Sequence, residues 1–284
     1  MVTPFDAQGK VDEEALRRLI DHLINGGVHG IFAIGTTGEF YALSNSEYRR
    51  ALDITIDHVK GRVPVYAGAN AITTHQSIEL AQLAEAAGVD AISVLTPYFI
   101  SVSQQELYDH YKAIAASTCK PIIMYDNQPK THVHLQPVTV AKLADIDNIV
   151  AMKDSTGDFT NMEECLRLTK DKDFHMMQGR DTLIHAALCY GATGAVAACA
   201  NVAPRITADI YDKFIAGDLQ GSLEAQYRLA PLRIAFTLGS FPTVIKEALE
   251  MIGVPVGACF PPTGKMSSEE RVQLKEILTG MQLM

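Results

Sequence analysis

The chain has 284 residues, with 24 Lys and Arg, 33 Asp and Glu, and a formal net charge of -9 at pH 7. This length fits one large domain or two small ones. The content of 48% hydrophobic and 20% charged residues is typical of an ordinary globular protein and excludes global disorder. Excess negative charge repels phosphate backbones and anionic lipid, so we expect neither nucleic-acid nor membrane-surface binding.

The cysteines indicate a reducing compartment. They are odd in number, scattered and never spaced as CxxC: Cys119, Cys165, Cys189, Cys199 and Cys259. Neither a disulfide framework nor a structural zinc site follows from this pattern. The longest nearly apolar run, residues 195–203, is far shorter than the roughly 20 residues that span a bilayer. No basic-then-apolar leader opens the chain, so we expect a cytoplasmic protein.

The predicted elements begin with a short strand and an amphipathic helix. Val2 and Thr3 are the remnant of a first strand that is cut short. Asp12 precedes the first helix, which ends at residues 25–27. One apolar stripe runs along this helix, formed by Ala15, Leu16, Leu19, Ile20 and Leu23.

Seven further strands alternate with helices along the chain. The strand-like runs start at Val28, Val63, Asp90, Pro121, Asn148, Phe174 and Ala192. Because these runs are apolar on both faces, they are typical of parallel strands covered by helices. Four capping-box matches mark helix starts, at Ser44-x-x-Glu47, Thr73-x-x-Gln76, Ser103-x-x-Glu106 and Ser267-x-x-Glu270.

The tail has no strand-like run. Amphipathic stretches occur at about residues 206–215, 222–236 and 244–252, and a last one runs toward residue 284. We therefore expect residues 1–203 to hold the strands and most helices of a barrel. Residues 204–284 add the last barrel helix and a C-terminal helical appendix.

Two α/β architectures are compatible with this alternation, a closed (β/α)8 TIM barrel and an open doubly wound sheet. An open sheet would usually carry a Gly-rich nucleotide fingerprint, and neither GxGxxG nor GxxxxGK[ST] occurs. We predict the barrel, with eight strands if the shortened first strand is counted. In a barrel the chemistry lies at the C-terminal ends of the strands.

The segment Gly35-Thr36-Thr37-Gly38-Glu39 follows a strand end and precedes a capped helix. Its glycines allow close backbone approach, and free amides and two hydroxyls can converge on an anion. A carboxylate site is one interpretation. A plain tight turn with a hydroxyl cap is the other.

Tyr125 and Lys153 end two strands that follow one another along the chain. A desolvated lysine loses its proton more readily, and the neutral amine can attack a ketone to form a Schiff base. The alternative for Lys153 is a surface ion pair beside Asp154. The alternative for Tyr125 is a core aromatic whose hydroxyl reaches solvent.

Together these positions resemble the family of dihydrodipicolinate synthase and N-acetylneuraminate lyase, over nearly the whole chain. The carrying motifs are the GTTGE loop, a Tyr at the end of the predicted fifth strand and KDSTGD at the sixth. TPY at residues 96–98 and Gly179-Arg180-Asp181 add to the match. The resemblance implies a class I, Schiff-base lyase on a (β/α)8 barrel with C-terminal helices. It also implies a homotetramer, a dimer of dimers.

By that resemblance, Lys153 forms an imine with pyruvate and needs no metal or organic cofactor. Thr36 and Thr37 hold the keto-acid carboxylate beside Gly38, and Thr36 passes protons with Tyr125, the general acid and base. Further predicted substrate-binding positions are Lys130, Gly179, Asp181 and Val196.

The sequence departs from the family pattern at three places. Phe99 stands where a second tyrosine is donated across the subunit interface, and the Tyr-Asn-x-Pro motif is replaced by residues 125–129 with the proline displaced by one. Lys130 stands where dihydrodipicolinate synthases use an arginine, and lysine lacks the bidentate fork. Lys130 favours a lyase acting on a 2-keto-3-deoxy sugar acid, with an aldolase as the main prediction. The alternatives are a sugar-acid dehydratase and a synthase condensing pyruvate with aspartate semialdehyde.

Two rival hypotheses remain. A metal-dependent aldolase would need clustered ligands, for which the nearest candidate is His132-Val133-His134. A non-catalytic keto-acid sensor is favoured by Phe99 and the displaced proline, but it does not explain why Lys153, Tyr125 and Thr36 are all present.

Overall fold

A computed structural model describes residues 1–284. The chain divides into two compact units. Unit 1 joins Met1–Val65 to Ala197–Met284, and unit 2 is the continuous segment Tyr66–Val196. The division at residue 203 expected from the sequence remains a prediction. None of the helices has the length and the apolar character needed to cross a membrane.

Unit 2 is built on a parallel sheet whose strands follow the chain order. Its strands are β2 (Val65–Gly68), β3 (Ala91–Leu95), β4 (Ile122–Asp126), β5 (Ile149–Asp154), β6 (His175–Gln178) and β7 (Gly194–Ala195). Each strand pairs in parallel with the next one. Parallel neighbours need a crossover between them, and helices supply it here, as the alternating pattern predicts.

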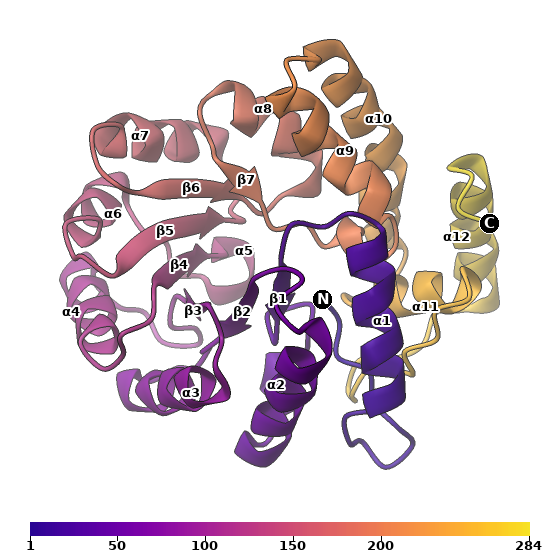
Figure 1. Ribbon diagram of the computed structural model, residues 1–284, viewed down its shortest axis with the longest axis horizontal. Helices are drawn as coiled ribbons and strands as arrows, with labels where there is room; N and C mark the ends of the chain where they lie inside the picture. The colour runs from indigo at the N-terminus through magenta and orange to yellow at the C-terminus, as the bar shows by residue number, and fades with distance from the viewer. The chain divides into compact units, whose positions relative to one another are not determined.

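Most helices of unit 2 lie along the outside of these strands (Figure 1). They are α3 (Thr74–Ala87), α4 (Gln104–Ala115), α6 (Pro137–Leu143), α7 (Phe159–Thr169) and α8 (Ile184–Cys189). Two short helices follow strand ends instead, α5 (Gln128–Thr131) after β4 and the 3-10 helix η2 (Asp181–Leu183) after β6. Ala91, Ile123 and Ala151 form a buried apolar cluster on β3, β4 and β5. This cluster supports the residues at the strand ends, two positions further along β4 and β5.

Unit 1 combines both ends of the chain. Its N-terminal part contains α1 (Glu13–Asn25), β1 (Ile31–Ala33), the 3-10 helix η1 (Phe40–Ala42) and α2 (Asn45–Val59). Its C-terminal part contains η3 (Cys199–Asn201), α9 (Pro204–Ile215), α10 (Leu219–Ala235), η4 (Phe236–Leu238), α11 (Thr243–Met251) and α12 (Ser268–Gly280). The predicted apolar stripe of α1 is buried along its whole length. The Ile31 amide donates to the Pro64 carbonyl at 2.9 Å, which ties β1 to the end of unit 1's N-terminal segment.

The predicted strand at Val2 and Thr3 is not formed. The Val2 amide donates to Asn201 Oδ1 at 2.8 Å, and Thr3 Oγ1 donates to the Gly38 carbonyl at 2.6 Å. Because a side chain takes the Val2 amide, no backbone ladder is built there. The structure therefore has seven strands, and the predicted fifth and sixth strands are β4 and β5.

Candidate active site

Lys153 and Tyr125 lie side by side near the C-terminal ends of β5 and β4. They are register partners, so their side chains leave the sheet on the same face. Lys153 Nζ lies 3.9 Å from the centroid of the Tyr125 ring. Lys153 is only 8% exposed and Tyr125 only 3%. This burial excludes the interpretation of Lys153 as half of a surface ion pair.

Asn127 adds a contact that the sequence interpretation missed. Its side chain is buried, and Nδ2 donates to Tyr125 Oη at 2.9 Å. A phenol that accepts one hydrogen bond can still donate its own proton to another group. In the sequence, Asn127 is marked only by lying two residues after a tyrosine that ends a strand. This spacing is too common to indicate a functional residue.

Gly179 lies directly against the lysine. It follows β6, and its amide donates to the Asp154 carbonyl at 2.6 Å. A Cβ at this position would lie 1.9 Å from Ser155 Oγ, 2.8 Å from the Asp154 carbonyl oxygen and 3.0 Å from Lys153 Cε. Glycine is therefore the residue that fits, because the backbone passes too close for any side chain.

The next two residues continue this edge of unit 2. Arg180 Nη2 donates to the Thr156 carbonyl at 3.1 Å, which ties it to the loop after β5. Gly157 in that loop has φ +85°, and a Cβ there would lie 3.1 Å from Arg180 Nε. Asp181 is buried and begins η2. The KDSTGD loop and the Gly-Arg-Asp segment thus contact one another.

The opposite face of β4 and β5 carries two buried carboxylates. Asp126 and Asp154 are register partners that directly follow Tyr125 and Lys153. Since successive strand residues point to opposite faces, these carboxylates point away from the lysine. Asp126 Oδ2 lies 2.8 Å from His134 Nδ1. A polar layer therefore lies behind the two predicted catalytic residues.

The surroundings shift the pKa values of Asp154 and His134 in this layer. Burial raises the pKa of Asp154 to about 6, although the amide and hydroxyl of Thr156 donate to its Oδ1 at 2.8 and 2.7 Å. The hydrogen bond to Asp126 raises the pKa of His134. His134 Nε2 lies 3.1 Å from Asn161 Oδ1. Both ring nitrogens of His134, which the sequence offers as half of a metal site, thus have protein partners.

Two further predicted substrate-binding residues, Lys130 and Val196, also belong to unit 2. Lys130 is exposed on α5. Val196 is half-buried just after β7, and its amide donates to the Gln178 carbonyl at 2.8 Å.

The predicted carboxylate-binding residues Thr36, Thr37 and Gly38 form a compact turn in unit 1. The Gly38 amide donates to the Gly35 carbonyl at 3.0 Å, and the Glu39 amide donates to the Thr36 carbonyl at 3.2 Å. Thr36 and Thr37 are half-buried, whereas Gly38 is buried. A Cβ on Gly38 would lie 3.1 Å from the Met1 carbonyl oxygen. We call residues 35–39 the GTTGE loop.

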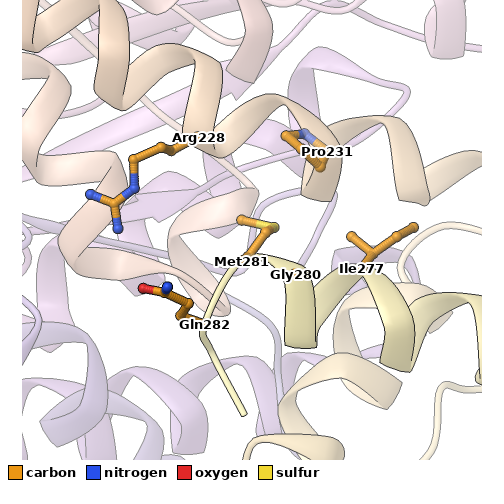
Figure 2. A pocket seen from close by; sticks show the side chains of 6 residues that line it. All are labelled: Arg228, Pro231, Ile277, Gly280, Met281 and Gln282. Atoms are coloured by element: carbon orange, nitrogen blue, oxygen red, sulfur yellow. The ribbon is translucent and has the colours of Figure 1, made fainter.

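The structure also contains a surface groove between α10 and the end of α12 in unit 1. Its volume is about 450 Å³, and it is lined by Arg228, Pro231, Ile277, Gly280, Met281 and Gln282. Figure 2 shows Arg228 and Gln282 on one side of the groove and Ile277 on the other. None of the predicted site residues lines it.

The sequence matches the Dihydrodipicolinate synthetase family over residues 1–281. The chain belongs to this family. A relative named 4-hydroxy-tetrahydrodipicolinate synthase, from Methanothrix thermoacetophila, is 38% identical over 281 residues, which cover 99% of this chain and 95% of the relative.

Solved structures agree with membership of the dihydrodipicolinate synthetase family. One is YagE, a prophage protein of this family from E. coli K12, solved in complex with pyruvate. It has a TM-score of 0.96 and 32% identity, covering 100% of this chain and 97% of its own. Another is a monomeric dihydrodipicolinate synthase variant, with a TM-score of 0.97 and 30% identity, covering 100% and 95%.

Membership of this family bears on the predicted fold class and on the predicted enzyme class. The predicted fold class, a (β/α)8 TIM barrel with additional C-terminal helices, is confirmed by these solved structures. The chain is a lyase of the class I aldolase type, as the dihydrodipicolinate synthetase family and its named members indicate.

Proposed function

We propose that this lyase uses pyruvate, and that Lys153 forms the Schiff base with it. The observation that supports this proposal best is the pairing of a buried lysine amine with a tyrosine ring at 3.9 Å, at the ends of neighbouring strands. A lysine amine in this position can attack the keto carbon of a bound keto acid to form an imine. YagE, which is similar over its whole length, was solved with pyruvate.

Each step of the proposed reaction needs only protons and water, and neither a metal nor an organic cofactor. The Lys153 amine adds to the keto carbon of pyruvate, and loss of water leaves a protonated imine. The imine accepts the electron pair released when the methyl carbon loses a proton, which gives an enamine. The enamine carbon then attacks an aldehyde, whose oxygen takes up a proton, and water hydrolyses the imine to free Lys153. Cleavage follows the same steps in reverse.

The other predicted residues have distinct roles in this proposal. Tyr125 exchanges the protons, with its hydroxyl oriented by Asn127 Nδ2. Thr36, Thr37 and Gly38 bind the keto-acid carboxylate, because amides and hydroxyls suit an anion. Gly179, Asp181, Lys130 and Val196 contact the rest of the substrate.

Two candidate substrates, one for cleavage to pyruvate and an aldehyde and one for condensation with pyruvate, are each favoured by one observation. A 2-keto-3-deoxy sugar acid is favoured by Lys130, because an exposed lysine lacks the fork that binds a second carboxylate bidentately. Aspartate semialdehyde is favoured by the curated relatives, which are named 4-hydroxy-tetrahydrodipicolinate synthase at 38% and 37% identity. Turnover measured separately with each compound decides between them.

We also propose that the enzyme is a cytoplasmic homotetramer, built as a dimer of dimers. The family resemblance supports both statements. The monomeric variant among the similar structures shows that tetramers are not universal in this fold.

The proposal is tested by trapping the imine. We expect wild-type protein treated with pyruvate and borohydride to gain the mass of the reduced adduct, and peptide mapping to place it on Lys153. Lys153→Ala should lose the adduct because no amine is left to attack the ketone. Intact-mass analysis measures both results.

Lys142→Ala is the matched control, because Lys142 is an exposed lysine on α6 in the same unit. It should be trapped like the wild type. An adduct that persists in Lys153→Ala would contradict the assignment. Trapping without turnover of any aldehyde or sugar acid would favour the sensor hypothesis.

A further inference from the structure

Unit 1 contains a fully buried ion pair that the proposed reaction does not use. Lys246 Nζ, from α11, lies 2.6 Å from Glu39 Oε1, and the two side chains are 2% and 0% exposed. Glu39 is the last residue of the GTTGE loop. Lys246 lies on the apolar face of its helix, among Val244, Ile245 and Leu249.

Each charge has a second polar partner. Lys246 Nζ donates to the Ala258 carbonyl at 3.0 Å and lies 4.6 Å from the centroid of the Phe5 ring. The Phe260 amide donates to Glu39 Oε2 at 2.7 Å. Removing two charges from water is costly, and a buried ion pair contributes less to stability than an apolar pair of the same shape. Stability alone therefore does not explain why a buried ion pair is present here.

The ion pair also bears on the backbone conformation of the GTTGE loop. Glu39 has φ +53°, and Ile34 on the other side of the loop has φ +55°. Both are unusual for residues with a side chain, and such conformations persist only when neighbouring contacts enforce them. The Glu39 amide donates to the Thr36 carbonyl at 3.2 Å. The position of Glu39 thus directly sets the backbone that carries Thr36.

We propose that Lys246 is a positioning residue, which holds Glu39 and through it the conformation of the GTTGE loop that binds the carboxylate of the keto acid. This inference rests on the proposed function, because it assumes that Thr36 and Thr37 bind that carboxylate. Thr3 contributes from the other side of the loop, where its hydroxyl donates to the Gly38 carbonyl at 2.6 Å. Lys246 itself contacts no substrate.

The test compares a single variant with a double variant. The measured quantity is the pyruvate concentration that gives half-maximal borohydride trapping, together with the midpoint of thermal unfolding. Lys246→Met leaves the Glu39 carboxylate buried without its partner, so the midpoint should fall. The half-saturating concentration should rise about tenfold, the loss expected for one hydrogen bond to a charged group.

The double variant, Glu39→Gln with Lys246→Met, removes both charges and leaves an amide oxygen for the Phe260 amide. We expect the thermal midpoint to recover while the half-saturating concentration stays raised, because the contact between residues 39 and 246 is lost even though the Phe260 amide keeps its acceptor. If both quantities recover together, the pair is merely structural and the inference is wrong. The double variant also keeps the test decisive if Lys246→Met does not fold.

Lys10→Met is the matched control. Lys10 Nζ lies 3.5 Å from Glu47 Oε1, a half-exposed ion pair of the same unit that does not contact the GTTGE loop. Neither quantity should change much in this variant. Absence of a Lys153 adduct in wild-type protein would contradict the proposed function and, with it, this inference. A normal wild-type adduct with unchanged half-saturation in both Lys246 variants would contradict the inference alone.

Discussion

At the scale of single residues, the lack of space beside Lys153 restricts the site as much as its chemistry does. A Cβ on Gly179 would lie 3.0 Å from Lys153 Cε and 2.8 Å from the Asp154 carbonyl oxygen, so even a methyl group does not fit there. Such contacts come from strands that are distant in the sequence. The sequence could therefore show a glycine after a strand, but it could not show what that glycine touches.

Gly179→Ala should weaken both the fold and the formation of the adduct. Its Cβ would overlap Ser155 Oγ and a backbone oxygen that cannot rotate away. We expect a loss of about 1 to 3 kcal/mol in the free energy of unfolding, the usual range for overpacking. Urea unfolding and borohydride trapping measure the two effects.

Gly194→Ala in β7 is the control, since the nearest atom to its Cβ would be Met177 Cε at 3.8 Å, an ordinary contact. Adding Ser155→Ala to Gly179→Ala should restore only part of the stability, because the clash with the Asp154 carbonyl oxygen remains. A Gly179→Ala variant as stable and as reactive as the wild type would show that the backbone can shift freely here.

The same limit explains which site residues the sequence revealed. The strand-end pattern placed Lys153 and Tyr125 at one edge of the sheet, but it left a surface ion pair open for Lys153, and the roles of both residues came from the family resemblance. Lys246 was not predictable, because a single lysine in an amphipathic helix is normally solvent-facing. Its partner, Glu39, lies in the other terminal part of the chain. Only tertiary structure brings these two charges together.

At the scale of elements, helix starts were the most predictable feature. Ser44, Thr73, Ser103 and Ser267 all accept a hydrogen bond from the expected amide. The full reciprocal capping box forms only at Ser103 and Ser267. At Ser44 the expected partner, Glu47, instead accepts from the Val11 amide at 2.8 Å. A tertiary contact thus replaced the local one, which no sequence pattern indicates.

Helices α3 and α4 provide a prediction about pH. Thr74 Oγ1 lies 2.9 Å from Nδ1 of the buried His110, and burial lowers the pKa of His110 from 6.5 to about 4. Below pH 6.5 the unfolded chain therefore binds a proton at this residue that the folded chain does not bind. The contribution of His110 to stability is complete above that pH and is lost as the pH falls toward 4.

We expect His110→Gln to reduce the loss of unfolding free energy between about pH 7 and about pH 4.5 by on the order of 2 kcal/mol. Urea unfolding at both pH values gives this difference. His75→Gln, a change at an exposed histidine of α3, should lose as much stability as the wild type. Equal losses in all three proteins would mean that His110 takes up its proton in the folded state.

At the scale of the whole molecule, an exposed apolar loop supports assembly. Phe99, in the loop after β3, is 90% exposed and is followed by the exposed Ile100. Neighbouring large apolar side chains that remain exposed often mark an interface. The resemblance places Phe99 where a tyrosine crosses between subunits, so the loop fits the proposed tetramer.

We expect sedimentation velocity to give a tetramer of the 30.9 kDa chain, with dimers appearing on dilution. Lys153→Ala should sediment in the same way, because the lysine is buried. A single monomeric species at every concentration would contradict the predicted assembly and place this enzyme with the monomeric variant of the family.

The two compact units also bear on the order in which the chain can fold during synthesis. Unit 2 is one continuous segment, whereas residues 1–65 make their unit contacts with residues 197–284. At roughly 5 to 20 residues per second, a ribosome needs on the order of ten seconds to add the intervening segment. The GTTGE loop is therefore made early but completed late, since Lys246 and Phe260 emerge near the end of translation. Between the addition of Lys153 and that of Lys246, the nascent chain has the lysine of the proposed Schiff base but lacks the ion pair that we propose positions the GTTGE loop.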